Sequence, residues 1–264
     1  MNRRMQTSVG AILALMALLV SVATPWAEEP EEVNTGDDFT RTVTRFDLRF
    51  EYQDLPKDST AKVMTAREDK LVEFPKGWEV GLRMDIPYEW SDQESKDNPK
   101  PPQNQNGFGD ILAQAIVSTP EMNDFTGGIG LRLYFPTAAK DQMGKGRYRA
   151  DPMAGGKYHV MKDVWVALLL RQDADIGGDR TRSIINRFYI QPYVHLTLPR
   201  LWTVDYAPEF EYDWLTSQWF IPFDIRVGKM LTKKNIISVE YWTNIQGENP
   251  SYNWQIEFRV GHFF

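Results

Sequence analysis

The chain has no cysteine and only three histidines among its 264 residues. Without cysteine, disulfide frameworks and cysteine-ligated zinc sites are excluded. Long apolar runs are also scarce. After residue 27 the longest is 164–170, which is far too short to cross a membrane as a helix. The formal net charge is −6, and an acidic chain is a poor candidate for binding nucleic acid.

The one long apolar run lies near the amino terminus. Two arginines precede an apolar stretch over 9–23, and acidic residues begin directly after Ala27. This pattern predicts a secretory signal peptide over 1–27, with cleavage after either Ala23 or Ala27. An uncleaved anchor is the alternative, although the run is short for a spanning helix. Removal of 1–27 leaves 237 residues with a formal charge of −8, enough for one large domain.

Aromatic residues, in contrast, are abundant. Nine Trp, eleven Tyr and fourteen Phe are a heavy load for a chain with a mean hydropathy of −0.46. Many of them alternate with polar residues. Along 254–264 one parity carries Trp254, Ile256, Phe258, Val260 and Phe264, and the other carries Gln255, Glu257 and Arg259. A period of two indicates a β-strand with one apolar and one polar face.

The same alternation recurs along the chain and predicts about twelve strands. The clearest strands cover 40–53, 78–90, 202–214, 219–227, 237–245 and 254–264. Weaker patterns cover 60–73, 108–119, 125–135, 152–160, 164–173 and 185–197.

The spacing of aromatic residues favours a membrane barrel over a soluble periplasmic sandwich, which is the rival fold. Three strands place aromatic residues ten positions apart on the apolar face, at Trp78–Tyr88, Trp202–Tyr212 and Trp254–Phe264. Ten residues cover roughly 33 Å. A tilt of about 40° reduces this to roughly 25 Å, the height of the apolar band of an outer-membrane barrel. We predict an all-β fold, a transmembrane antiparallel up-and-down β-barrel of about 12 strands, over 40–264.

The connections between these strands alternate in length, as they do in outer-membrane barrels. Short periplasmic turns are predicted at 74–77, 120–124, 161–162, 198–201 and 232–235. Outer loops are predicted at 91–107, 136–150 and 174–184, with shorter ones at 215–218 and 246–251. Residues 28–39 are acidic and aperiodic, which predicts a disordered periplasmic leader or a small plug.

Charged residues on the inward parity are the candidates for a constriction, because lumen charges select what passes through a barrel. The predicted lumen residues are Arg45, Arg49, Arg83, Asp85, Arg132, Arg187, Glu209 and Arg226. The acidic residues Asp205, Glu209, Glu211 and Asp213 fit either a paired-carboxylate or cation site or a charge lattice with these arginines. The lattice is the favoured interpretation.

Catalytic and metal sites find little support in the sequence. His195 is the only histidine placed to assist a serine nucleophile. It is followed by Leu-Thr-Leu, not by the Ser-Asn-Gly of outer-membrane phospholipases. Residues 173–179 are faintly similar to a calcium loop, but position twelve is Ile184 instead of the closing glutamate. We predict no catalytic residue, no cofactor and no metal.

A basic cluster lies in the predicted outer loop 136–150. Lys145, Arg147 and Arg149 surround two glycines there. A solvated loop is the simpler interpretation. Contact with lipopolysaccharide phosphates is the functional one, because guanidinium and ammonium groups bind phosphate strongly.

Several segments together resemble a known family. They are Gly-Phe-Gly-Asp at 107–110, the glycine-rich strand 127–137, the loop glycines at 144–146, Trp-Phe-Ile-Pro-Phe-Asp at 219–224, and the strand ending in Phe264. In order and spacing they are similar to the phenol-degradation (meta-pathway) outer-membrane transporter family, which is distantly similar to fatty-acid-type hydrophobic-compound channels. This resemblance covers nearly all of the mature chain and implies a Gram-negative outer-membrane location. The chain lacks the long amino-terminal plug of fatty-acid-type channels.

The sequence therefore predicts an outer-membrane channel or uptake protein that passes small molecules through a narrow, charge-lined lumen without a chemical step. The family resemblance implies hydrophobic or aromatic solutes. Two alternatives stay open: a lipid-modifying barrel enzyme, and a closed structural or adhesive barrel that acts through its outer loops. The expected partners are outer-membrane lipid, lipopolysaccharide and a small-molecule solute. The resemblance of the Phe264-terminated strand to those of outer-membrane barrels adds the barrel assembly machinery.

Overall fold

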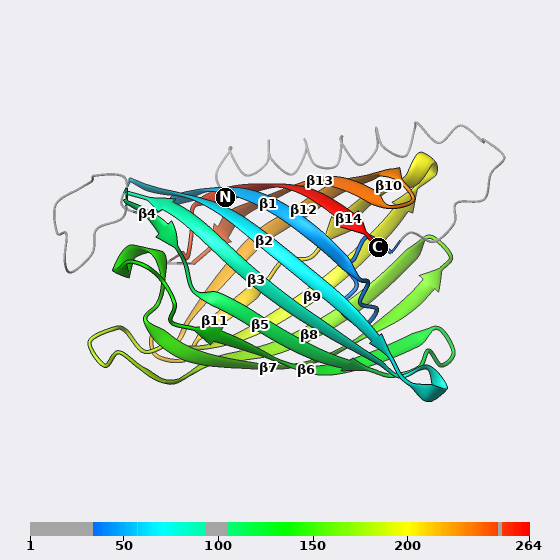
Figure 1. The fold of residues 1–264 in the computed structure, drawn as a ribbon, viewed down its shortest axis with the longest axis horizontal. Helices are drawn as coiled ribbons and strands as arrows, with labels where there is room; N and C mark the ends of the chain where they lie inside the picture. The colour runs from blue at the N-terminus through cyan, green and yellow to red at the C-terminus, as the bar shows by residue number, and fades with distance from the viewer. Residues whose placement is uncertain (1–33, 57, 93–104, 248–249) are drawn as a thin grey trace. The chain divides into compact units, whose positions relative to one another are not determined.

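The computed structural model describes residues 34–56, 58–92, 105–247 and 250–264, which form a closed antiparallel β-barrel (Figure 1). The predicted signal peptide over 1–27 lies outside the described residues. None of the helices in the described part of the chain has the length and hydropathy of a membrane-crossing helix.

Fourteen strands and three short 3-10 helices make up the described chain. The strands are β1 (Arg45–Leu55), β2 (Ser59–Glu73), β3 (Glu79–Ser91), β4 (Gln105–Phe108), β5 (Ile111–Ser118), β6 (Phe125–Phe135), β7 (Arg147–Met161), β8 (Val164–Gly178), β9 (Asn186–Leu198), β10 (Trp202–Tyr206), β11 (Phe210–Asp213), β12 (Gln218–Thr232), β13 (Asn235–Gln246) and β14 (Trp254–Phe263). The helices are η1 (Pro75–Gly77), η2 (Asp141–Met143) and η3 (Pro199–Leu201).

The barrel closes where the first strand meets the last. β1 pairs with β2 on one side and with β14 on the other. β4 and β5 both pair with β3, so they are two parts of one interrupted strand. In the same way β10 and β11 both lie between β9 and β12. The fourteen strands therefore form a twelve-stranded barrel, which confirms the predicted fold class.

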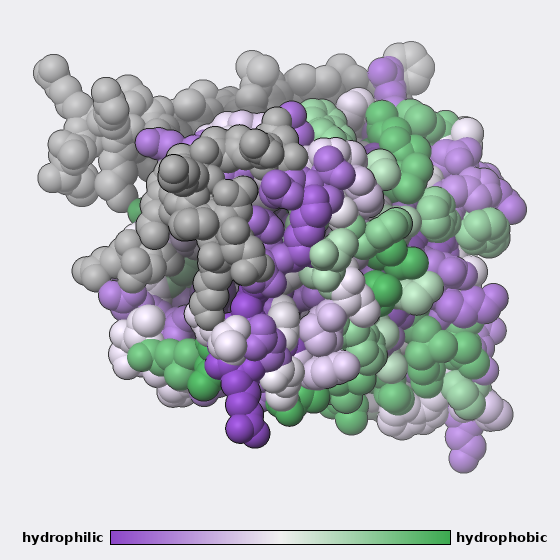
Figure 2. Space-filling model, turned by 60° about the vertical axis from the view of Figure 1, so that its left-hand side comes forward, coloured by the Kyte–Doolittle hydropathy of each residue, from purple (hydrophilic) through white to green (hydrophobic). Residues whose placement is uncertain are grey.

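The alternation predicted from the sequence separates the inward from the outward side chains of the barrel wall. On β1, Leu48 is 48% exposed, whereas its neighbour Asp47 is 0% exposed and points inward. Outward apolar side chains recur on every long strand. Figure 2 shows hydrophobic side chains gathered on the barrel wall. A polar interior with an apolar exterior is the reverse of a soluble protein, and it is the arrangement that a lipid bilayer stabilises.

Turns and loops lie at opposite ends of the barrel (Figure 1). The predicted short turns are present after β2, β5, β7, β9 and β12. Longer connections lie at the other end, including 136–146 between β6 and β7. Most of the predicted loop 91–107 lies outside the described residues. We call the two ends the turn end and the loop end.

Two strands extend further toward the loop end than the alternation predicted. β7 begins at Arg147, not at 152, and β8 continues to Gly178, not to 173. The predicted boundaries were wrong because the extensions carry charged side chains, among them Arg147 and its partner Asp175. Beyond the apolar band no face needs to be apolar, so the alternation that reveals a strand disappears there.

The predicted strand 202–214 is interrupted at 207–209. Pro208 lies at the centre of the break and has no backbone N–H to donate to a neighbouring strand. The register is nevertheless preserved across the break, since Tyr206 pairs with Val194 and Phe210 with Ile190. Inward and outward faces therefore stay as the alternation predicted.

Candidate functional site

Residues 34–44, which precede β1, lie inside the barrel. The carboxylate of Asp37 is held by two arginines of the wall, at 2.6 Å from Arg226 on β12 and 2.8 Å from Arg259 on β14. The carbonyl oxygen of Thr35 accepts hydrogen bonds from Arg45 and Arg259. We call 34–44 the lumen segment.

The lumen segment also reaches the opposite wall. Asp38 pairs with Lys157 on β7 at 2.6 Å, and both side chains are buried. Phe39 packs against Tyr193 on β9, with ring centroids 6.0 Å apart. It also contacts a small apolar cluster formed by Ile116, Met153 and Leu169. Charge and apolar contact therefore fix the segment on both sides of the lumen.

Gly36 allows the segment to approach the wall this closely. Its φ of +74° lies in the left-handed region that favours glycine. A Cβ atom at this position would collide with the guanidinium of Arg45. Both the turn and the contact with Arg45 therefore require a residue without a side chain.

Asp37 lies in a strongly positive environment. Burial alone would raise the pKa of its carboxyl, but the charges of Arg226, Arg259 and Arg45 outweigh burial. They hold the pKa of Asp37 well below its usual range. The carboxylate is therefore ionised at neutral pH and binds these arginines as an anion.

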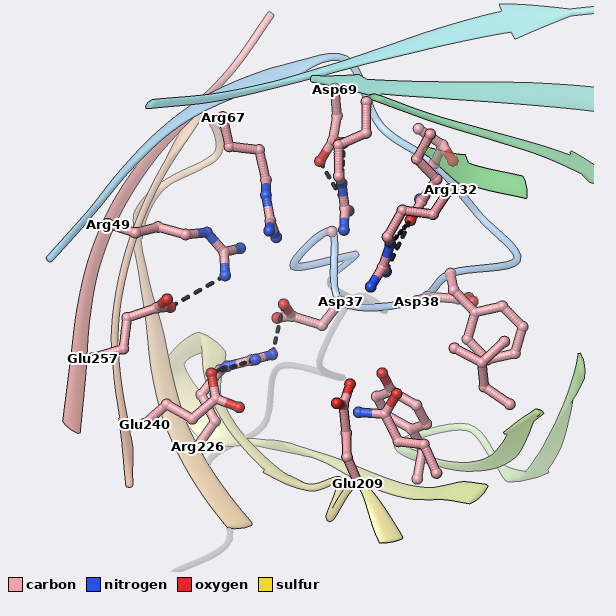
Figure 3. Close-up of a pocket in the computed structure, with 18 of the residues that line it drawn as sticks. Asp37, Asp38, Arg49, Arg67, Asp69, Arg132, Glu209, Arg226, Glu240 and Glu257 are labelled. Atoms are coloured by element: carbon pink, nitrogen blue, oxygen red, sulfur yellow. Dashed lines mark hydrogen bonds and ion pairs between the residues drawn. The ribbon is translucent and has the colours of Figure 1, made fainter. Parts of the chain in front are cut away.

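The lumen segment borders a cavity of about 290 Å³. Figure 3 shows Asp37 projecting toward the middle of this cavity, with Arg49, Arg67 and Arg132 on one side. Glu240 and Glu209 point into it from the other side. The arrangement can bind or screen small solutes by charge, because long side chains of both signs reach the same narrow space.

The structure brings six of the eight predicted lumen residues together. The cavity is lined by Arg45, Arg49, Arg83, Arg132, Glu209 and Arg226. Their role in a constriction stays a prediction.

The other two predicted lumen residues lie outside the cavity lining. Asp85 pairs with Arg67 at 2.6 Å and is covered by it. Arg187 lies nearer the loop end, where it pairs with Glu211 at 3.1 Å and Asp213 at 3.3 Å. Parity placed both residues on the inner face, but parity gives no height along the barrel.

Several cavity residues were missed by sequence reasoning. They are Asp37, Arg67, Glu240, Glu257, Trp242 and Tyr252. Arg67 belongs to a weakly alternating strand, and Asp37 to an aperiodic segment without any strand signal. Glu240 and Glu257 carried the inward parity, so the signal for them was present.

The predicted acidic residues of 202–214 are each paired. Glu209 contacts Arg171 at 2.8 Å, and Asp205 contacts His195 at 2.6 Å. Within the described residues, no three acidic or histidine side chains are arranged to hold a metal ion. In the calcium-like stretch 173–179 the first two aspartates form ion pairs with Arg149 and Arg147 instead.

The basic cluster of loop 136–150 is divided between two environments. Arg147 and Arg149 lie on β7 and point inward, with partners Asp175 and Asp173 across the sheet. Lys145 remains in the loop and is exposed. Lipopolysaccharide contact stays a prediction that rests on Lys145, because the two arginines are occupied inside the barrel.

His195 lies in a buried polar cluster at the turn end. Its Nδ1 atom is 2.6 Å from Asp205, and its Nε2 atom is 3.1 Å from the hydroxyl of Thr197. The imidazole stacks on Trp165, with centroids 4.8 Å apart. His195 and Trp165 line a second cavity of about 180 Å³ beside the lumen segment.

Comparisons with known proteins extend the description of the fold. No family model matches the chain, and no curated protein matches it. Among solved structures, an outer-membrane channel from Pseudomonas putida F1 matches with a TM-score of 0.73 and 14% identity, covering 88% of this chain and 100% of that one. The NanC porin matches with a TM-score of 0.56 and the KdgM porin with 0.55, each with 14% identity and covering 83% of this chain and 99% of theirs. At these identities the likeness shows the fold alone, which is that of an outer-membrane β-barrel.

Proposed function

We propose that the protein is an outer-membrane channel that passes small molecules through a narrow, charge-lined lumen. The observation that carries the proposal is the cavity itself. It lies inside a closed barrel with an apolar exterior, and charged side chains of both signs line it. The three solved structures named above, two porins and one channel, share this fold and support the same function.

The lumen segment acts in this proposal as a small plug. It crosses the lumen and is bound to both walls through Asp37 and Asp38. Passage then requires either the narrow space that the segment leaves open or its displacement. Residues 28–39 were expected to be a leader or a plug, and the contacts of the second half of this range favour the plug.

The location follows from the same reasoning. An exported chain of this fold assembles in the outer membrane of a Gram-negative bacterium, with the strand ending in Phe264 as the signal for the assembly machinery. Residues 1–27 act as the signal peptide that directs export. The solute class suggested by the phenol-degradation family resemblance is a hydrophobic or aromatic compound. Fractionation of membranes from cells that express the full chain tests the location, and recovery in the soluble periplasm would contradict it.

Planar-bilayer conductance of the refolded, signal-free protein tests the channel. Discrete steps that scale with salt are the expected result. Silence from protein that circular dichroism finds folded would contradict an open lumen. Replacing Arg83 and Arg132 by alanine should raise the cation-to-anion permeability severalfold, because both line the cavity. Unchanged selectivity would remove these two residues from the path.

The cluster around His195 keeps the enzyme alternative testable. A hydroxyl, an imidazole and a carboxylate in contact are the parts of a nucleophilic site. Here, however, Thr197, His195 and Asp205 are all buried. We therefore propose a structural role, in which His195 supports the turn end of the wall. A phospholipid hydrolysis assay on the protein and on His195→Ala decides the matter, since activity lost in the variant would establish the enzyme.

A further inference from the structure

A row of three glutamates crosses one wall of the cavity. Glu51 on β1 lies directly opposite Glu257 on β14, and Glu257 lies directly opposite Glu240 on β13. All three line the cavity. Like charges in direct register destabilise a sheet. This row therefore lowers the stability of the wall unless positive charge reaches it.

Arginines beside the row neutralise two of its members. Glu257 accepts a hydrogen bond from Arg49 at 3.1 Å. Glu240 accepts one from Nε of Arg226 at 2.7 Å. Glu51 receives a hydrogen bond from the side-chain amide of its neighbour Gln53, and no arginine or lysine among the described residues forms an ion pair with it. One charge of the row is left without a cation.

Asp224 adds a second carboxylate of this kind. It lies on β12, is 2% exposed and lines the cavity. Its Oδ1 atom has no hydrogen-bond partner among the described residues. A buried carboxylate without a cation or a full set of donors is costly. Oδ1 of Asp224 can therefore accept a hydrogen bond from a ligand in the cavity.

Trp242 places an aromatic surface beside these carboxylates. It lies directly opposite Asp224 in the sheet and two residues after Glu240, so all three are on the inner face. Tyr252 lines the same cavity. Ammonium and guanidinium groups are attracted to aromatic faces, most strongly to tryptophan. Carboxylates next to an aromatic ring are the chemistry that recognises an organic cation.

We propose that Glu51, Asp224, Glu240 and Trp242 form a binding site for a small organic cation, an ammonium group on a compact apolar body. We call these four residues the cation patch. The ammonium donates to Oδ1 of Asp224 and the apolar body packs on Trp242, while Glu51, three strands along the wall, adds negative charge to the same cavity. A cavity of about 290 Å³ matches the lower end of small-molecule sites. The inference rests on the proposed channel function, because it names the charge class of a solute in the same lumen.

Isothermal titration of the full mature chain in non-ionic detergent tests the site, with benzylammonium as the probe. Benzenesulfonate and benzyl alcohol are the anionic and neutral controls of similar size. We expect saturable binding of the cation and none of the controls. Asp224→Asn should weaken binding about tenfold or more, because one hydrogen bond to a charged group has that effect. Trp242→Leu should weaken it severalfold.

Glu89→Gln is the matched control variant, since Glu89 lies on the same inner parity but outside the cavity lining. Its binding should equal that of the unchanged protein. Equal affinities of Asp224→Asn and Glu89→Gln would overturn the proposal, as would saturable binding of benzenesulfonate in place of the cation. If Asp224→Asn does not fold, Glu51→Gln provides the same comparison at a less buried position.

Bilayer conductance of the same samples separates this inference from the channel. Conducting protein without saturable cation binding overturns the cation patch and leaves the channel in place. Cation binding by protein that never conducts supports the patch and overturns the channel.

Discussion

On the wall formed by β2 and β3, arginines and aspartates lie opposite one another, whereas the wall formed by β1, β14 and β13 sets glutamate against glutamate. Arg67 pairs with Asp85 at 2.6 Å, and one step along, Asp69 pairs with Arg83 at 2.6 Å. These reciprocal pairs satisfy each other within the wall. The glutamate row is neutralised only in part, since Glu257 and Glu240 have arginine partners and Glu51 has none among the described residues. One wall is therefore built for stability and the other for interaction with what enters.

The largest effect should come from removing a carboxylate from the wall formed by β2 and β3, where aspartates pair with arginines. Asp69→Asn leaves Arg45 and Arg83 without their shared anion in a buried position. We expect a loss of about 3–5 kcal/mol in the free energy of unfolding, as for other broken buried pairs. Urea unfolding in lipid vesicles, followed by tryptophan fluorescence, measures it.

Arg187→Ala is the control for this change, because its side chain is 32% exposed near the loop end. Its pairs should contribute only about 0–1 kcal/mol. Equal losses for the two variants would contradict the distinction between buried and half-exposed pairs.

Asp37→Asn should release the lumen segment from β12 and β14. The change removes charged hydrogen bonds to Arg226 and Arg259. Each such bond contributes about 1.5–3 kcal/mol, so the fraction of undocked segment should rise about tenfold or more. Larger or more frequent conductance steps are the expected readout. Identical traces would contradict a blocking role of this segment.

The pH dependence of docking follows from the pKa of Asp37. Because the folded-state pKa is depressed, the stabilisation is fully present above the unfolded value of about 3.9 and is lost as pH falls through the lower folded value. Conductance governed by the segment should therefore be constant from pH 8 to pH 5 and rise only in stronger acid. A transition near pH 6 would assign the opening to other groups.

The smallest effect should be of opposite sign. Glu51→Gln makes the same carboxylate-to-amide change on the wall formed by β1, β14 and β13, and it relieves repulsion between Glu51 and Glu257. We expect the free energy of unfolding to increase by about 0.2–1 kcal/mol, the usual size of a cross-strand pair. The same urea experiment measures it, and a clear loss of stability would place a stabilising partner on Glu51.

The sequence by itself determined which residues face inward. Alternate residues of a β-strand point to opposite faces, and lipid outside the barrel requires the apolar face to point outward. The orientation of residues such as Asp47 or Arg226 therefore followed from the alternation alone. Strand number and turn positions followed from the same pattern. The prediction was wrong at the loop ends of β7 and β8, where charged side chains beyond the apolar band remove the alternation.

Only the tertiary structure decided which inward charges meet. Parity says nothing about register, and the register between β1, β14 and β13 is what brings Glu51, Glu257 and Glu240 into one row. The lumen segment has no periodicity at all, so its position depends on long-range pairs such as Asp37 with Arg259. Local pattern is set by neighbours in sequence, whereas a cavity is set by strands that closure of the barrel brings together.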